Sequence, residues 1–194
     1  MTWTALINGL AVHGLGEEAI RAFDEMRSSG FSPDSVTLKA VLVACSHSGL
    51  VEEGWRIFKS IEEYGMEPTI EHYGCLVDMM GRAGMIQQAF DFVENIPVRP
   101  NSVIWRTLLG ACVSHNNLKL AEKVRERIRE IDPNHDGDYV LLSNVYGGLS
   151  RWTEKAKVRS SMQKQRIDHP GHVELGDGET ESWRILASHN GCTA

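Results

Sequence analysis

Residues 3–34 read WTALINGLAVHGLGEEAIRAFDEMRSSGFSPD, and this stretch decides the fold. Its apolar residues form two runs, residues 3–10 and 19–26, which lie on either side of Gly14. Within each run they recur at i, i+3 and i+4, the spacing of one face of a helix. Pro33 then stops the second run, and the aspartate that follows it can cap the next helix. The stretch therefore predicts a helical hairpin.

The same pattern returns along the chain. A large apolar or aromatic residue recurs with steps of 35, 35, 32 and 34 residues, at Trp3, Leu38, Tyr73, Trp105 and Tyr139. Turn signals follow at Gly14, Gly49, Gly84 and Asn117, and prolines close the units at Pro33, Pro68, Pro100 and Pro133. A single hairpin cannot bury its apolar face, so such units must stack. The sequence predicts an all-α protein, a right-handed α-solenoid of about five helical hairpins.

Composition limits the function classes. The chain has 194 residues, 42% of them hydrophobic, and its 20 Lys and Arg against 26 Asp and Glu give a net charge of -6. This balance argues against a protein that holds nucleic acid by general neutralisation of phosphates. The longest uncharged stretch, residues 1–16, is shorter than the roughly 20 apolar residues of a membrane span, so we expect no membrane partner.

The first residues show neither a secretory signal nor a transit peptide. Four cysteines occur without a CxxC pair, and we interpret them as free thiols of a reducing compartment.

Several units resemble a known family. The strings at 3–34, 36–68 (VTLKAVLVACSHSGLVEEGWRIFKSIEEYGMEP) and 71–101 resemble pentatricopeptide repeats, and their alternating lengths resemble the plant organellar PLS subclass, which mixes repeat types. The next two units, 103–133 and 139–167, resemble the tetratricopeptide-like E-type motifs that follow the last repeat in that subclass. The expected division is three pentatricopeptide repeats in residues 1–101, two E-type motifs in residues 102–167, and a divergent, loosely ordered tail in residues 168–194.

The resemblance implies a partner and a role. Proteins of this family bind single-stranded RNA of the mitochondrion or chloroplast with one base per repeat, most often to mark sites of C-to-U editing. The resemblance further implies that multiple organellar RNA editing factors are partners and that a DYW-type deaminase acts in trans. In the family, a base is held by the fifth and last residues of a repeat, while the second packs against its face. These positions correspond to the pairs Thr4 with Asp34, Lys39 with Thr69, and Gly74 with Asn101, and to Met1 and Val36 as packing residues, whereas the third repeat has Glu71 there.

The chemistry of these side chains can be stated without the family. An ionised Asp34 only accepts hydrogen bonds, so it suits a base edge that donates, such as guanine N1–H or uracil N3–H. Together with Thr4 it resembles the guanine pair of the family. Asn101 both donates and accepts and suits adenine, but Gly74 offers no side chain beside it.

Other interpretations stay open. Asp34, Thr69 and Asn101 are all residue types that cap helices, and Lys39 can be an ordinary solvated lysine. The recurring aromatic residues lie in phase with the apolar face, which favours core packing over base stacking. The basic residues of 119–129 and 151–159 can contact phosphates or form a solvated helix face. The alternative function is a tetratricopeptide-like scaffold that binds proteins without reading RNA.

We expect no enzyme activity, cofactor or metal. His172 and Glu174 form an HxE triplet, the first half of a zinc-deaminase signature. The second half needs two thiolates at CxxC spacing, and only Cys192 follows. We interpret the triplet as coincidence.

Overall fold

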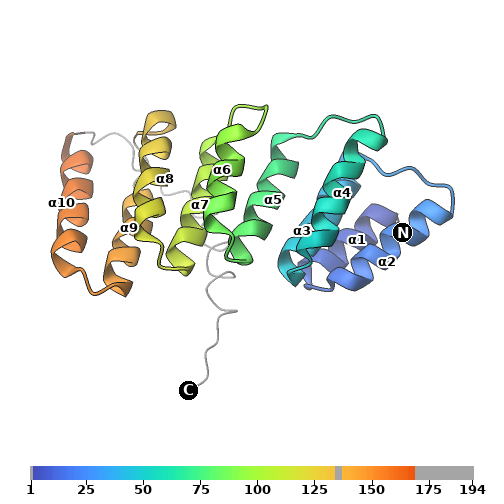
Figure 1. Cartoon of the computed structure of the whole chain (residues 1–194), viewed down its shortest axis with the longest axis horizontal. Helices are drawn as coiled ribbons and strands as arrows, with labels where there is room; N and C mark the ends of the chain where they lie inside the picture. Colours follow the sequence, from blue (N-terminus) through green and yellow to red (C-terminus); the bar gives the residue numbers. More distant parts are fainter. Residues whose placement is uncertain (1, 134–136, 169–194) are drawn as a thin grey trace, which may run out of the picture.

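The computed structural model describes residues 2–133 and 137–168, and within them the chain forms ten α-helices and no β-strand. Successive helices pair into five hairpins that follow one another in a row (Figure 1). The helices are α1 (Trp3–Val12), α2 (Gly16–Ser28), α3 (Ser35–Ser48), α4 (Val51–Glu63), α5 (Ile70–Arg82), α6 (Ile86–Asn95), α7 (Ser102–Ser114), α8 (Leu118–Ile131), α9 (Gly137–Gly148) and α10 (Trp152–Asp168). This confirms the predicted all-α solenoid.

The first helices of the hairpins form a continuous row. Helix α1 packs on α3, α3 on α5, α5 on α7, and α7 on α9, while the second helix of each hairpin also contacts the first helix of the next. Equivalent residues of successive first helices therefore lie next to one another along this row, as a stacked repeat requires.

Local signals explain where the helices begin and end. The left-handed residue Gly49, with a φ of 69°, ends α3, a backbone conformation that glycine adopts without steric cost. In the fourth hairpin the sequence predicted the turn at Asn117. The left-handed residue is instead Asn116, with a φ of 51°, and Asn117 caps α8 by accepting a hydrogen bond from the amide of Leu120 at 3.2 Å. Asparagine suits both positions, so two adjacent asparagines divide the turn between them.

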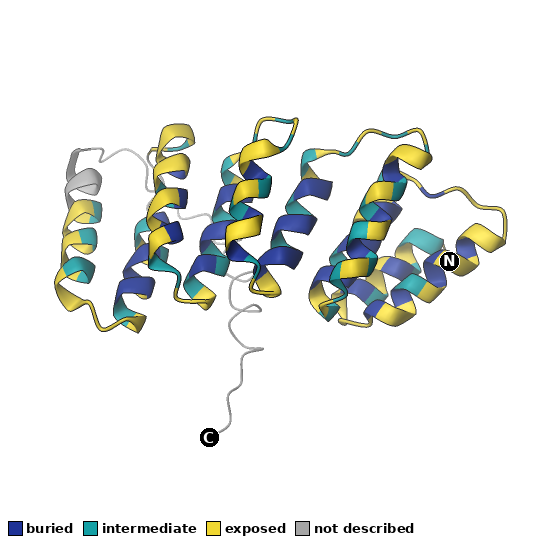
Figure 2. Cartoon of the chain, in the orientation of Figure 1, coloured by how far each residue is buried: buried dark blue, intermediate teal, exposed yellow. Residues whose placement is uncertain are grey.

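The core runs between the two helices of each hairpin and between neighbouring hairpins (Figure 2). Tyr73 and Trp105 are buried in it, which confirms core packing for these recurring aromatic residues. The core has two clusters, and the partly buried Trp55, Phe58 and Phe92 pack against both. The ring centroids of Trp55 and Phe92 are 5.4 Å apart, and those of Phe58 and Tyr73 are 5.2 Å apart, both edge to face. An aromatic seam thus joins the second hairpin to the third.

Some sequence predictions fall outside the described residues. These are the tail beyond Asp168, with the HxE triplet and Cys192, and the packing residue Met1. In the described ranges no helix combines the length and apolar character needed to cross a membrane. The same ranges contain no group of three or more His, Cys, Asp or Glu side chains that can hold a metal ion. The three described cysteines are free thiols.

Candidate nucleic-acid interface

The structure brings the first predicted pair together. Thr4 lies in the first turn of α1, and Asp34 caps α3. Buried Thr37 stands between them: its Oγ1 lies 2.8 Å from Oγ1 of Thr4 and donates to Oδ1 of Asp34 at 2.7 Å. The two predicted side chains therefore belong to one hydrogen-bonded chain. We call the residues at the fifth and last positions of a repeat its reader pair. In the first hairpin these are Thr4 and Asp34.

Asp34 both caps a helix and offers a carboxylate to solvent. Its Oδ1 also accepts from the backbone amide of Thr37 at 2.7 Å, which is the N-cap bond of α3. The bonds from the hydroxyl and then the amide of Thr37 hold the pKa of Asp34 below its ordinary value of 3.8, so it is ionised at neutral pH. Both bonds end on Oδ1 of an exposed residue, and Oδ2 is the oxygen that a ligand would meet. Capping is therefore real, but it uses only half of the carboxylate.

The second reader pair is arranged differently. Lys39 is exposed on α3, whereas Thr69 is drawn toward buried His72, whose Nδ1 lies 3.0 Å from the Thr69 amide nitrogen and 3.1 Å from its hydroxyl oxygen. Because the amide donates to Nδ1, the Nε2 of His72 donates to the carbonyl of Ser35 at 3.1 Å. The hydrogen bond from Thr69, then the bond from the backbone amide of Glu71 and, to a lesser extent, the charge of Lys39 lower the pKa of Glu71. Thr69 thus serves mainly as a helix cap.

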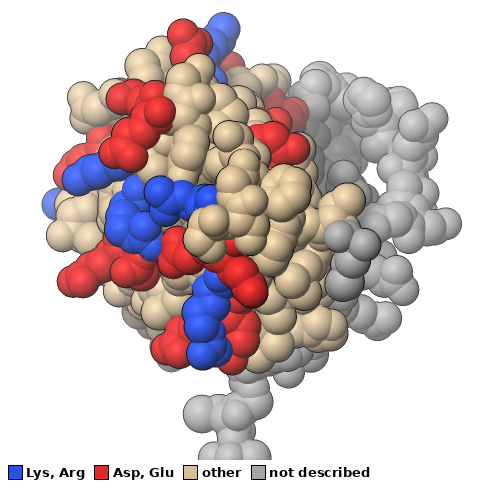
Figure 3. Space-filling view, turned by 90° about the vertical axis from the view of Figure 1, so that its right-hand side faces the viewer, with Lys and Arg blue, Asp and Glu red and all other residues tan. Residues whose placement is uncertain are grey.

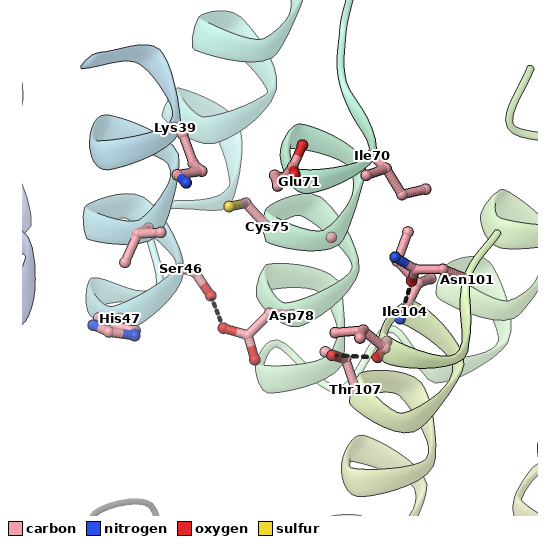
Figure 4. Close-up of a pocket in the computed structure, with 13 residues that line it drawn as sticks. Lys39, Ser46, His47, Ile70, Glu71, Cys75, Asp78, Asn101, Ile104 and Thr107 are labelled. Atoms are coloured by element: carbon pink, nitrogen blue, oxygen red, sulfur yellow. Dashed lines mark hydrogen bonds between the residues drawn. The ribbon is translucent and has the colours of Figure 1, made fainter. Parts of the chain in front are cut away.

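The third reader pair lines a pocket of about 410 Å³ between α3, α5 and α7 (Figure 4). Asn101 caps α7, accepting from the amide of Ile104 at 3.0 Å, while Gly74 forms part of the floor opposite. A Cβ atom built on Gly74 would lie 3.8 Å from Cγ1 of Ile104, an ordinary contact. The missing side chain of Gly74 therefore leaves room beside Asn101, and Lys39 of the preceding hairpin reaches the same pocket.

The pocket also has an acidic side that the repeat positions do not include, formed by Glu71 and Asp78. Asp78 accepts from the hydroxyl of Ser46 at 2.6 Å and from Nε of Arg82 at 2.9 Å. It lies seven residues after Glu71, so both carboxylates share one face of α5. The seven-residue spacing of Glu71 and Asp78 was the sequence signal that could have identified this acidic face. Cys75 also lines the pocket, and burial raises the pKa of its thiol to about 12, so it stays protonated.

Two valines occupy equivalent second positions. Val36 is 51% exposed on α3, and Val103 is 63% exposed on α7. Val36 was predicted as a packing residue, and Val103 was not, because its unit was assigned to the E-type motifs. The spacing of 67 residues, close to two units, could have identified it. Between them, the third repeat carries the exposed Glu71.

The fourth hairpin uses its fifth position for internal ion pairs. Arg106, equivalent to Thr4, donates from Nη2 to Oδ2 of Asp132 at 2.6 Å. Asp132 is the C-cap of α8, and the last position of this unit, His135, lies outside the described residues. Arg106 also donates from Nε to Oδ1 of Asp138 at 3.1 Å and from Nη1 to Oγ of Ser102 at 3.1 Å. Only 17% of its side chain is exposed. The fifth position of this hairpin is therefore internally satisfied.

The cations of the second helices are largely held by neighbours. On α8, Arg127 forms two hydrogen bonds of 2.8 and 2.9 Å with Glu94 of α6, and the guanidinium of Arg125 lies 4.1 Å from the ring centroid of Tyr139. At the end formed by α1 and α2, Lys and Arg side chains stand among Asp and Glu (Figure 3). There Arg21 pairs with Glu18 at 3.2 Å. This pattern fits the solvated helix face proposed as an alternative to phosphate contacts.

Comparison with known proteins identifies the repeats. Models described as PPR repeat family and PPR repeat match residues 1–47 and 36–66, and the E motif model matches residues 115–174. The pentatricopeptide repeat-containing protein At3g29230 of Arabidopsis thaliana is 44% identical over 97% of this chain and 32% of its own length. The DOT4 protein of that plant, named chloroplastic, is 42% identical over 88% and 20%, and At1g56690, named mitochondrial, is 45% identical over 90% and 25%. The chain spans a third or less of these relatives.

Solved structures show the same fold. Maize PPR10 superposes with a TM-score of 0.68 at 23% identity, over 84% of this chain and 24% of that protein. PPR10 in complex with an 18-nt psaJ RNA element gives a TM-score of 0.72 at 20% identity, over 84% and 25%. The helical hairpins, the matched repeats and the matched E motif agree, and the chain belongs to the plant pentatricopeptide repeat proteins of the PLS subclass.

Proposed function

We propose that the first three hairpins bind single-stranded RNA of the mitochondrion or chloroplast, with one base per reader pair. One observation carries the proposal: the reader positions of successive hairpins lie on the continuous row of first helices. Thr4, Lys39 and Gly74 are 35 residues apart and hold the same repeat position on α1, α3 and α5, of which α1 packs on α3 and α3 on α5. Such a row can meet consecutive bases of an extended strand.

The chemistry of the first pair supports a preference for guanine. Asp34 is ionised and exposed, and Thr4 is linked to it through Thr37. Carboxylate oxygens accept from the N1–H and the amino group of guanine, whereas the N1 of adenine is itself an acceptor. A strand with guanine at this position should therefore bind more tightly than one with adenine.

The reading surface should end at the third pair. The guanidinium of Arg106 is already hydrogen-bonded to Asp132, Asp138 and Ser102, so a base would have to displace three bonds to use it. The pocket between α3, α5 and α7 is the last place where polar reader groups and the exposed valine of α7 meet.

The biological role is the finer part of the proposal. We place the chain in organellar RNA processing, in the recognition of C-to-U editing sites, with a DYW-type deaminase recruited in trans and multiple organellar RNA editing factors as partners. The organelle names of two relatives support the organellar location, and the RNA in the PPR10 complex supports RNA binding. The editing role itself rests on the family resemblance. We assign the partner proteins to the segment that the E motif model matches, residues 115–174, because its units resemble tetratricopeptide hairpins.

Binding of the 194-residue chain to short fluorescein-labelled RNAs that differ in a single base tests the proposal by anisotropy. The wild-type chain should prefer guanine at the position of the first hairpin, and Asp34→Asn should shift this preference toward adenine, because an amide can also donate. Asp132→Asn is the matched control, since this aspartate of the fourth hairpin is paired with Arg106 and should not affect base preference. An Asp34→Asn chain with an unchanged guanine preference would contradict the assignment.

The last hairpin favours a second function, the binding of a protein partner. Trp152 is 64% exposed at the start of α10, and Leu149 beside it is 40% exposed. Tryptophan is enriched at protein–protein interfaces and among the residues that contribute most to their affinity. Calorimetry with a purified editing factor, without RNA, should show at least about fivefold weaker binding for Trp152→Ser. Equal binding by the wild-type and Trp152→Ser chains would exclude this surface.

A further inference from the structure

We propose that Thr37 is a positioning residue that sets the base specificity of the first hairpin, because it fixes the direction in which the Thr4 hydroxyl donates. The inference rests on the proposed RNA binding and deepens it. Thr37 lies outside the fifth, last and second positions through which the repeats are expected to hold bases. Its role follows from hydrogen-bond geometry alone.

The number of hydroxyl protons fixes the direction of the hydrogen bonds between Thr4, Thr37 and Asp34. A threonine hydroxyl has one proton to donate. The hydroxyl oxygen of Thr37 lies 2.7 Å from Oδ1 of Asp34, and an ionised carboxylate can only accept, so the Thr37 proton is used there. Thr37 therefore has no proton left for the 2.8 Å contact with Thr4. The Thr4 hydroxyl must donate to Thr37.

We call the hydrogen bonds from Thr4 to Thr37 and from Thr37 to Asp34 the hydroxyl relay. This relay determines which groups of the first reader pair a bound base would contact. With its proton directed at Thr37, Thr4 presents only lone pairs, and Asp34 also presents only an acceptor. The first reader pair is thus an all-acceptor surface, which complements the two donors on the guanine edge and repels the acceptor N1 of adenine. A Thr4 hydroxyl free to rotate could donate to adenine N1, and discrimination between the purines would fall.

The surroundings of Thr37 hold it in this role. It is buried in the first turn of α3, and both its hydroxyl and its backbone amide donate to the same oxygen of Asp34, each at 2.7 Å. Two bonds from one residue to one atom leave the hydroxyl little freedom. The relay therefore reaches Thr4 in a fixed orientation.

The equivalent residues of the next two hairpins form no such relay. Ile104 has no hydroxyl, so Asn101 is bonded only by its backbone amide. His72 contacts Thr69, but its other nitrogen is bonded to the carbonyl of Ser35 and not to Lys39. Among these hairpins the hydroxyl relay belongs to the first reader pair.

The test compares purine selectivity in three variants of the full chain. Thr37→Val keeps the shape of the side chain and removes the hydroxyl. Thr37→Ala also removes the hydroxyl and leaves a smaller side chain, in case valine disturbs folding. Thr37→Ser retains the hydroxyl. We measure the ratio of Kd values for RNAs with adenine or guanine opposite the first hairpin. Thr37→Val and Thr37→Ala should reduce this ratio about fivefold, mainly through tighter adenine binding, and Thr37→Ser should keep it.

A double-mutant cycle separates this role from a merely structural one. If Thr37 acts through Thr4, then Thr37→Val should leave the purine ratio unchanged in a Thr4→Val background, even though it still lowers the thermal stability. An unchanged ratio in both Thr37→Val and Thr37→Ala, with a clear guanine preference in the wild type, would overturn this inference and leave the proposed function standing. A wild-type chain without any base preference would overturn both.

Discussion

The first and fourth hairpins put the fifth repeat position to opposite uses. In the first, buried Thr37 bridges Thr4 and Asp34, and Asp34 stays exposed to solvent. In the fourth, Arg106 reaches Asp132, and the two form an ion pair. A fifth side chain that reaches an internal carboxylate is therefore held within its hairpin, whereas one that does not stays available to a ligand.

Removal of Arg106 has the largest expected effect on stability, because it removes the ion pairs of the fourth hairpin. Asp138, 6% exposed, would lose the guanidinium that faces it, and Asp132 would lose its partner. Removal of one member of a buried ion pair is strongly destabilising, so Arg106→Met should lower the free energy of unfolding by about 3 kcal/mol in urea titrations followed by circular dichroism. Arg21→Met, which removes the exposed i,i+3 pair with Glu18, is the control and should cost less than about 1 kcal/mol. Similar losses in the two variants would refute the distinction.

Removing the carboxylate of the first pair has a smaller effect on stability and a direct effect on selectivity. Asp34→Ala deletes an N-cap and should cost about 1 kcal/mol while abolishing the guanine preference. Asn101→Ala deletes the equivalent cap of α7 and should cost a similar amount. It should leave the preference at the first hairpin intact. Loss of the guanine preference in both variants would mean that it depends on general stability.

A side chain added at Gly74 sharpens the comparison, because it gives the third hairpin the pair it lacks. The built Cβ meets only Ile104, at 3.8 Å, so Gly74→Thr should fold. With Asn101 it should raise the preference for adenine opposite the third hairpin about fivefold, and stability should change by less than about 1 kcal/mol. Gly110→Thr is the control, since its Cβ meets nothing within 4 Å on another part of the row. An equal gain in both variants would show that the pocket is not the cause.

The smallest effect is the pH dependence of the Asp34 cap. The pKa of this carboxyl is lowered on folding, so its stabilisation is complete above the ordinary value of 3.8 and is lost as the pH falls through the folded-state value. The difference in unfolding free energy between wild type and Asp34→Asn should therefore shrink between about pH 6 and about pH 3, and at this exposed site it should stay below about 1 kcal/mol. A difference that grows in acid would contradict the lowered pKa.

Much of the fold was predictable because it depends on periodicity. The 35-residue recurrence and the helical spacing place Tyr73 and Trp105 in the core, where the structure has them. Proline and glycine positions bound most helices for the same local reasons. The exchange of Asn116 and Asn117 could not be predicted, since either asparagine suits a left-handed turn or a cap.

The candidate site was predictable in position and not in chemistry. The family resemblance gave Thr4 and Asp34, and the structure joins them. The sequence does not show that Thr37 spends its proton on Asp34, because donor direction depends on distances between residues 33 positions apart. The sequence also does not show the pairing of Arg106 with Asp132, because the two residues are 26 positions apart and meet only through the packing of α7 against the end of α8.

The hydroxyl relay crosses the boundary between two repeats, and this bears on protein engineering. Thr4 belongs to one repeat and Thr37 to the next, although their hydroxyls are hydrogen-bonded to each other. A chimera joined after Asp34 would combine a reader pair with a foreign third residue, and one joined after Thr37 would transplant all three together. The transferable module is therefore offset from the sequence repeat by the first turn of the following helix.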